Sequence, residues 1–261
     1  MSFKTVIAGV ALGLSLIAAP AYAETIKIGA TPGPHAQILE AVKPILAAQG
    51  IDLEILEFSD YVIPNEALAS GELNANSFQH QPYLDNQVRD RGYAIESVAT
   101  TVNFPIGIYS DKYENIADLP DGAKIGIPND PTNGGRVLLL LEDNGLIDLK
   151  DGVGTAASVA DIVSNPKNFE ILEVDAAQLP RVLPDVDAAG INTNYAEQAG
   201  LDPVNDPILR ESPKGPYVNV IAVRTEDKDQ PWVKALVDAY HSDEIRTFVE
   251  TTFNGAVLAS W

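Results

Sequence analysis

Segments with the alternation of β-strands and segments with the spacing of α-helices follow one another along the chain from residue 24 onward. In 24–30 the apolar residues fall on one face, as in a strand, and a turn rich in Pro leads into 37–48, where the apolar residues have helical spacing. A second strand over 52–58 completes a β-α-β unit. Because parallel strands need a crossover and a helix supplies it, this order predicts mainly parallel sheets flanked by helices.

The same alternation continues to the C-terminus. Further strands are predicted over 74–78, 95–101, 106–109, 124–127, 170–174, 188–192 and 217–224, and further helices over 64–70, 82–91, 135–143, 159–164, 176–183, 232–240 and 243–253. Pro44 is expected to kink the first helix or to mark its true start, since proline removes a backbone donor. The pattern predicts an α/β protein of two lobes, 24–105 with 220–261 returning to it and 106–219, with the ligand in the cleft between them.

The first 23 residues have the features of a secretory signal peptide. Lys4 is their only cation, an apolar stretch follows over 6–19, and the small-residue triplet 21–23 places the predicted cleavage before Glu24. The alternative is a retained membrane anchor, but the apolar stretch is shorter than the ~20 residues that span a bilayer. The chain contains no Cys, so no thiol is available for lipid attachment. We therefore expect a periplasmic protein without a lipid anchor.

The charge and the motif content exclude several classes of function. Lys and Arg number 17 against 37 Asp and Glu, and the net charge of −20 opposes binding to nucleic acid or to anionic lipid. The three His, at 35, 80 and 241, are too far apart for a local metal motif, and no nucleophile, zinc or P-loop motif occurs. The sequence thus predicts no metal, no cofactor and no catalytic residue.

An aromatic loop is the first candidate for a binding site. Residues 78–83 run from the end of a predicted strand into the start of a helix, which is a cleft-facing position in an α/β lobe. Phe78 and Tyr83 with the imidazole of His80 would suit an apolar or thioether side chain. The alternative is that the two aromatic residues fill the core and that His80 is an ordinary buried polar residue.

The second candidate is the loop 128–136, which joins a predicted strand to a helix that opens near Gly135. Free backbone N–H groups, the positive helix end and Arg136 would converge there, and a carboxylate fits that combination. Arg136 would hold the carboxylate by two parallel hydrogen bonds. The alternative is an ordinary turn followed by a surface arginine.

Two asparagines form the third candidate. Asn192 lies where a predicted strand passes into a helix, and Asn219 lies inside a strand that is otherwise rich in Val and Ile. A side-chain amide is donor and acceptor at once, so it can bind a carboxylate or an ammonium group. The alternatives are simple helix capping near Asn192 and a buried network that satisfies Asn219.

Five longer stretches occur in the chain in an order that is known from one family. They are SDYVIPNEAL at 59–68, NSFQHQPYLD at 76–85, PNDPTNGGR at 128–136, LKDGVG at 149–154 and PYVN at 216–219. Together they strongly resemble the methionine-binding receptors of methionine ABC importers, the NlpA lipoprotein family. The resemblance covers nearly the whole mature chain.

The resemblance implies a periplasmic binding protein fold of the second topological type, which closes around one amino acid and delivers it to a membrane permease driven by an ATPase. No cofactor is implied, and we expect a monomer. The implied pocket has four residues around the ligand side chain, one on its carboxylate and two on its polar end: Tyr61, Phe78, His80 and Tyr83, then Arg136, then Asn192 and Asn219. Phe104 is a further candidate for the wall. Most members carry a lipidated Cys after the signal, which this chain lacks.

Other functions stay open at this point. A receptor for another small amino acid or for a methionine-containing dipeptide is an alternative, because an apolar pocket discriminates by only ~1–3 kcal/mol per methylene. A periplasmic enzyme acting on amino acids or peptides is another, and product formation as opposed to stoichiometric binding would distinguish it. The third is an envelope interaction protein with a vestigial pocket.

Overall fold

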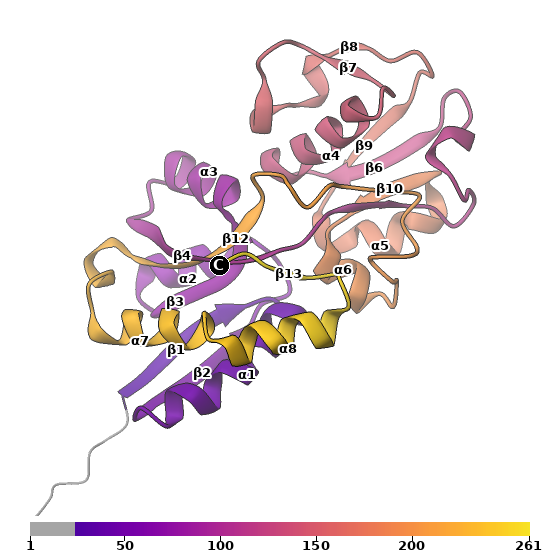
Figure 1. Cartoon of the computed structure of the whole chain (residues 1–261). Helices are drawn as coiled ribbons and strands as arrows, with labels where there is room; N and C mark the ends of the chain where they lie inside the picture. Colours follow the sequence, from indigo (N-terminus) through magenta and orange to yellow (C-terminus); the bar gives the residue numbers. More distant parts are fainter. Residues whose placement is uncertain (1–23) are drawn as a thin grey trace, which may run out of the picture.

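The computed structural model describes residues 24–261, and the predicted signal peptide lies outside them. The described chain forms two separate larger sheets, each with its own helices, which we call the first and the second lobe (Figure 1). No helix within 24–261 has both the length and the apolar composition needed to cross a membrane. The same range contains no cluster of three or more His, Asp or Glu side chains placed to hold a metal ion.

The first lobe is built on a six-stranded sheet of order β13-β4-β12-β3-β1-β2. Its strands are β1 (Glu24–Ala30), β2 (Ile51–Glu57), β3 (Ala75–His80), β4 (Ile95–Asn103), β12 (Val218–Arg224) and β13 (Leu258–Ala259). Its helices are α1 (Pro34–Ala47), α2 (Ile63–Ser70), α3 (Gln81–Arg91), α7 (Pro231–Tyr240) and α8 (Asp243–Phe253). The main core lies between the sheet and α1, α7 and α8, and a smaller core lies under α2 and α3 on the other face.

The second lobe is built on a five-stranded sheet of order β11-β5-β10-β6-β9. Its strands are β5 (Gly107–Tyr109), β6 (Lys124–Pro128), β9 (Glu170–Val174), β10 (Ala188–Ile191) and β11 (Leu209–Arg210), and β7 (Asp148–Leu149) pairs with β8 (Ile162–Ser164) beside them. Its helices are α4 (Pro131–Asp143), α5 (Leu179–Val182) and α6 (Thr193–Gln198). One core lies under α4, and a second, under α5 and α6, lies on the opposite face.

The chain passes between the lobes twice. It leaves the six-stranded sheet after β4 and enters the other sheet at β5, and it returns between β11 and β12 (Figure 1). β12 begins at Val218 and is antiparallel to β3 and β4. The lobe limits 24–105, 106–219 and 220–261 stay a prediction. The C-terminal end of β3 and the N-terminal end of β12 lie side by side and face the second lobe.

The parallel pairs follow the predicted β-α-β order. β1 is parallel to β2 and β3, and β6 is parallel to β9 and β10. Gly71 and Gly92 end α2 and α3 in the left-handed conformation, with φ of 85° and 69°, as expected for a glycine after the last helical turn. These ends were predictable because the cap is a local feature of the sequence.

Four predicted helices were wrong in extent or type. α1 begins at Pro34 and continues through Pro44, so Pro44 does not mark its start. α4 begins at Pro131, four residues earlier than predicted, because the Asp130 carboxylate caps it by accepting the backbone N–H of Asn133 at 2.9 Å.

The predicted helix over 159–164 is absent. Asp161 accepts hydrogen bonds from the backbone and hydroxyl of Ser158, which closes a single 3₁₀ turn over 159–161, and the next three residues form β8. Residues 176–185 likewise contain only the short α5 between two 3₁₀ turns. Pro180 and Pro184 lie at the beginnings of two of these short turns, where proline is tolerated.

Candidate functional site

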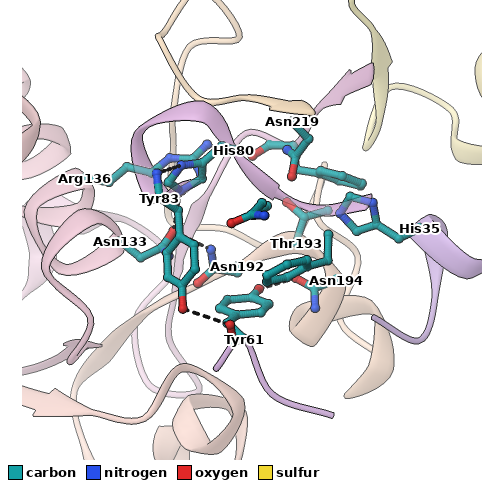
Figure 2. A pocket seen from close by; sticks show the side chains of 13 residues that line it. His35, Tyr61, His80, Tyr83, Asn133, Arg136, Asn192, Thr193, Asn194 and Asn219 are labelled. Carbon is teal, nitrogen blue, oxygen red and sulfur yellow. Dashed lines mark hydrogen bonds between the residues drawn. The ribbon is translucent and has the colours of Figure 1, made fainter. Parts of the chain in front are cut away.

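A cavity lies between the two lobes and encloses about 370 Å³ of space that protein atoms leave free, part of it open to solvent. The first lobe contributes one set of lining residues, and the second lobe contributes the other (Figure 2). The lining residues are His35, Tyr61, Phe78, Gln79, His80, Tyr83, Phe104, Asn133, Arg136, Asn192, Thr193, Asn194 and Asn219. The structure therefore brings together all seven predicted binding residues, and Phe104 with them.

His80 connects the two lobes at one side of the cavity. It is the last residue of β3 and the N-cap of α3, and its Nδ1 accepts the backbone N–H of Tyr83 at 3.1 Å. Nε2, which therefore carries the hydrogen, donates to Asn133 Oδ1 at 3.1 Å. Burial and the nearby Arg136 charge lower the pKa of His80 to about 3. The imidazole is thus neutral at physiological pH.

Three aromatic rings form the apolar wall of the cavity. The ring centroids of Tyr61, Phe78 and Tyr83 are 6.0–6.1 Å from one another. The Tyr83 hydroxyl donates to the Tyr61 carbonyl at 2.9 Å, which fixes the tip of this ring. Burial raises the pKa of Tyr61 well above its usual value, so its hydroxyl remains neutral. This wall suits an uncharged apolar side chain, as the aromatic loop predicts.

The strand under this wall is held by a buried amide network. Gln79 donates to the Asn65 side chain at 2.7 Å and to Asn76 Oδ1 at 3.0 Å, and Asn65 donates back to Gln79 Oε1 at 2.7 Å. All six residues of β3 are buried. The amides of Asn65, Asn76 and Gln79 satisfy one another, and they support the strand that places Phe78 and His80 at the cavity.

The polar wall comes from the second lobe. Asn192 Nδ2 donates to Asn133 Oδ1 at 2.9 Å, and the Tyr61 hydroxyl donates to Asn194 Oδ1 at 2.6 Å (Figure 2). This leaves Asn192 Oδ1 and Asn194 Nδ2, which are buried and have no hydrogen-bond partner in the described chain. One is an acceptor and the other a donor, and buried polar groups of this kind require a partner. They are available to a ligand in the cavity.

Asn219 comes to the cavity from the first lobe. It lies on β12 in register with His80 on the neighbouring β3, and it is 4% exposed. The strand pairing explains how a residue 139 positions away along the chain reaches the same cavity. The structure thus places both predicted asparagines at the cavity, on opposite lobes.

Arg136 lies in the second turn of α4 and is only 3% exposed, which excludes the alternative of a surface arginine. Its Nε donates to Glu211 Oε1 at 2.9 Å, and its Nη2 donates to Glu211 Oε2 and to the Phe104 carbonyl. The guanidinium lies 4.3 Å from the centre of the Tyr217 ring. Only Nη1 makes no hydrogen bond to the described chain, so the expected pair of parallel bonds to a ligand is wrong: Glu211 already occupies that edge.

The expected anion site at the start of this helix is also wrong in detail. The Asp130 carboxylate, not a ligand, accepts the Asn133 backbone N–H. A Cβ on Gly134 would lie 2.6 Å from the Pro128 carbonyl, and one on Gly135 would lie 2.7 Å from the Ala157 carbonyl. The two glycines therefore permit close packing of α4 on its neighbours rather than the approach of a ligand.

His35 is the main residue that the sequence analysis missed. It lies on the first turn of α1, its ring centroid is 4.7 Å from that of Phe104, and it closes the end of the cavity away from Arg136 (Figure 2). Its Nδ1 is buried without a partner in the described chain, and burial lowers its pKa to about 3. The signal was its position directly after the first parallel strand, where α/β lobes present ligand-binding residues.

Comparison with known proteins identifies relatives over nearly the whole chain. The family model described as NlpA lipoprotein matches residues 26–261. The D-methionine-binding lipoprotein MetQ of Escherichia coli (strain K12) is 47% identical over 239 residues, which are 90% of this chain and 88% of the relative. The predicted family resemblance is confirmed by these matches.

Solved structures match the fold as well. A nutrient binding protein from Burkholderia cenocepacia bound to methionine is 53% identical, with a TM-score of 0.88 over 90% of this chain and 100% of the other. A periplasmic substrate-binding protein of an ABC transporter from Coxiella burnetii is 47% identical, with a TM-score of 0.86 over 90% and 100%. The predicted two-lobed periplasmic binding protein fold is confirmed.

The comparisons contradict the predicted location. The matching family and the E. coli relative are named lipoproteins, that is, proteins that carry a lipid anchor. The expectation of a periplasmic protein without such an anchor is therefore wrong. The periplasmic location was inferred from the predicted signal peptide, and the lack of an anchor was inferred from the absence of Cys alone, which was too narrow a basis.

Proposed function

The chain belongs to the NlpA lipoprotein family, and on that premise we propose that it is the solute-binding protein of an ABC importer, binds methionine between its lobes and delivers it to the membrane permease and its ATPase. One observation carries the proposal: the cavity between the lobes has an aromatic wall from one lobe and a wall of amides with Arg136 from the other. A zwitterion with an apolar side chain matches that division.

The side chain of the ligand would lie against Tyr61, Phe78 and Tyr83. A thioether is polarisable and makes favourable contacts with aromatic rings, worth ~0.3–1.5 kcal/mol each. The wall has no charged group to pair with a second ionised side chain, and burying an unpaired charge is costly. The neutral His80 completes this wall. These features favour methionine over acidic and basic amino acids.

The backbone groups of the ligand would bind the polar residues. Arg136 Nη1 is the charged donor for the carboxylate, and Asn192 Oδ1 is an acceptor for the ammonium group. Asn219 provides a further amide from the first lobe. Each role follows from a hydrogen-bonding group that the protein itself leaves without a partner or with spare capacity.

Ligand binding would stabilise the closed arrangement of the lobes. Hydrogen bonds already link them directly, from the Tyr61 hydroxyl to Asn194 and from the Tyr195 hydroxyl to the Ser59 carbonyl at 3.2 Å. A ligand that contacts both walls makes contacts in the closed state that it cannot make in the open state. That difference is what shifts a population towards closure. The two crossings between the lobes would serve as the hinge.

We infer no catalytic role for this cavity. Its lining contains no Ser, Cys or Lys nucleophile, both lining imidazoles have a pKa of about 3, and the relatives are named for binding. The protein would act as a monomer, with one amino acid bound per chain.

Titration calorimetry tests the function directly. The protein is first unfolded, dialysed and refolded, since a tight binder can be purified with its ligand. We expect one L-methionine per chain, with D-methionine measured alongside because several relatives are named for it. Small-angle scattering should show a smaller radius of gyration with methionine. No binding of either enantiomer would overturn the proposal, and steady release of a product over time would favour the enzyme alternative.

A further inference from the structure

We propose that Glu211 determines which ligand charge the cavity accepts, because it neutralises Arg136 from the side that faces away from the ligand. This inference rests on the proposed function and deepens it, since it concerns the selectivity of the same site. Glu211 does not line the cavity and lies in a separate groove together with the far side of Arg136. It therefore acts through Arg136, as a positioning residue.

The pair is rigid and nearly dry. The side chains of Arg136 and Glu211 are 2% and 13% exposed. Both carboxylate oxygens accept hydrogen bonds from the guanidinium, in the parallel arrangement that Arg and carboxylates prefer. Tyr217 stacks on the guanidinium, and the Phe104 carbonyl accepts a bond from Nη2 at 2.8 Å. These contacts hold the Nε–Nη2 edge of Arg136 on Glu211 and the Phe104 carbonyl, away from a ligand.

Glu211 is itself fixed on a connection between the lobes. Its backbone N–H donates to the Ile106 carbonyl at 3.0 Å, and its Oε2 accepts the Ile106 N–H at 3.3 Å. Residue 106 follows the first crossing and residue 211 precedes the second. The carboxylate is thus held where the two crossings lie side by side, and its charge stays beside Arg136.

The remaining lining of the cavity adds no net charge. Arg136 is the only ionised residue among the thirteen that line it, since burial keeps His35 and His80 neutral. Asp130 does not line the cavity; Asn133 and Thr132 donate to its carboxylate, and burial raises its pKa. The lining residues together with Glu211 therefore carry no net charge.

A neutral site has a clear consequence for selection. A zwitterion brings no net charge into it, whereas an anion or a cation of the same shape brings one charge that nothing compensates. Without the Glu211 charge, the site would be positive and would favour an anion. Without the Arg136 charge, it would be negative and would favour the ammonium group.

The test compares two probes that share the carboxylate and the thioether. Methionine carries the ammonium group, and 4-(methylthio)butanoate lacks it. The ratio of their dissociation constants therefore measures how strongly the site favours or disfavours that positive charge. In Glu211→Gln we expect the butanoate to gain at least tenfold relative to methionine. In Arg136→Gln we expect the opposite change, and in the double variant Arg136→Gln/Glu211→Gln a ratio within threefold of the wild type.

Controls separate charge from structure. Asp143→Asn removes an equal charge from an exposed residue in the groove behind Arg136 and should leave the ratio unchanged. Glu211→Asp keeps the carboxylate and should retain the wild-type ratio. If Glu211→Gln does not fold, the opposite shift in Arg136→Gln and its reversal in the double variant still decide the question.

Two results would overturn the inference. One is an unchanged ratio in Glu211→Gln that still binds methionine, and the other is a double variant that shifts as far as either single one. These results leave the proposed function intact. Wild-type protein that binds neither probe would instead overturn the proposed function, and this inference with it.

Discussion

The two walls of the cavity consist of different types of side chain, and different contacts fix each of them in place. The first lobe provides aromatic rings on β3, on α3 and on the loop before α2, supported by the interlocked amides beneath β3. The second lobe provides amides and Arg136 near the N-terminal ends of α4 and α6, supported by side chains that cap and pair with them. One wall is suited to an apolar side chain and the other to a charged amino-acid backbone. Neither is a complete site, which makes closure part of recognition.

The variant Arg136→Ala, in the wall from the second lobe, should have the largest effect on both stability and methionine affinity. Removing a buried partner leaves Glu211 without compensation, so we expect the free energy of unfolding to fall by about 3–5 kcal/mol. Methionine binding should weaken by roughly a hundredfold or more, because a charge-assisted bond is lost with it. Urea unfolding and calorimetry measure the two effects.

Arg181→Ala is the matched control, because Arg181 is exposed on α5. This substitution should change neither the free energy of unfolding nor that of methionine binding by more than about 0.5 kcal/mol. Arg136→Ala protein with wild-type stability would show that the ion pair does not support the second wall. Near-native affinity would place the carboxylate elsewhere.

The selectivity of the aromatic wall should appear in how much different amino acids stabilise the native protein. At a hundredfold excess over its dissociation constant, L-methionine should add about 2.7 kcal/mol to the stability of the native state. Aspartate and lysine should add nothing measurable, because no charged group of the first lobe lines the cavity. A thermal-shift series over the amino acids measures this, and a larger shift with lysine than with methionine would refute the role of the wall.

The buried imidazoles should give a pH dependence that comes mainly from the first lobe. His35 and His80 have a pKa of about 3 in the folded protein and about 6.5 in the unfolded chain. As the pH falls below about 6.5, only the unfolded state takes up the protons, so stability is lost on acidification and is unaffected above that range. Each imidazole should cost about 1 kcal/mol between pH 6.5 and 5.5.

Urea unfolding at several pH values measures that slope. His35→Asn should remove about half of the contribution from the two imidazoles. His241→Asn is the control, because it keeps both buried imidazoles and changes a histidine at the end of α7, away from the cavity. A slope that does not respond to His35→Asn would mean that this imidazole takes up its proton as readily in the native state as in the unfolded chain.

The smallest effect should come from the direct contact between the lobes. Tyr195→Phe removes the hydroxyl that donates to the Ser59 carbonyl while keeping the ring, whose centroid lies 5.0 Å from that of Tyr61. One neutral hydrogen bond contributes about 0.5–1.5 kcal/mol, so methionine affinity should fall roughly threefold to tenfold. Tyr113→Phe, a half-buried residue that packs against a core of the second lobe, is the control. Unchanged affinity in Tyr195→Phe would show that the lobes close without help from this contact.

The sequence by itself determined the order of the elements and most of the binding residues. Periodicity and caps are local, so β1, α2, α3 and their glycine ends were predictable within one or two residues. The family motifs identified Tyr61, Arg136 and Asn219 together, although they lie far apart in the chain. Where local signals conflicted, as in 159–164, the strand pairing of β8 with β7 overrode the helical spacing.

Only the tertiary structure decided how those residues are used. Arg136 meets Glu211 across 75 positions and Tyr61 meets Asn194 across 133, and no local period encodes such pairs. The sequence therefore predicted an unpaired arginine that donates two parallel hydrogen bonds to a ligand. In the fold, Glu211 neutralises Arg136, and only Nη1 is left without a partner in the described chain. His35 became part of the cavity for the same reason: the fold brings the first turn of α1 to the cavity beside Phe104, and that placement, not the residue itself, determines what the imidazole faces.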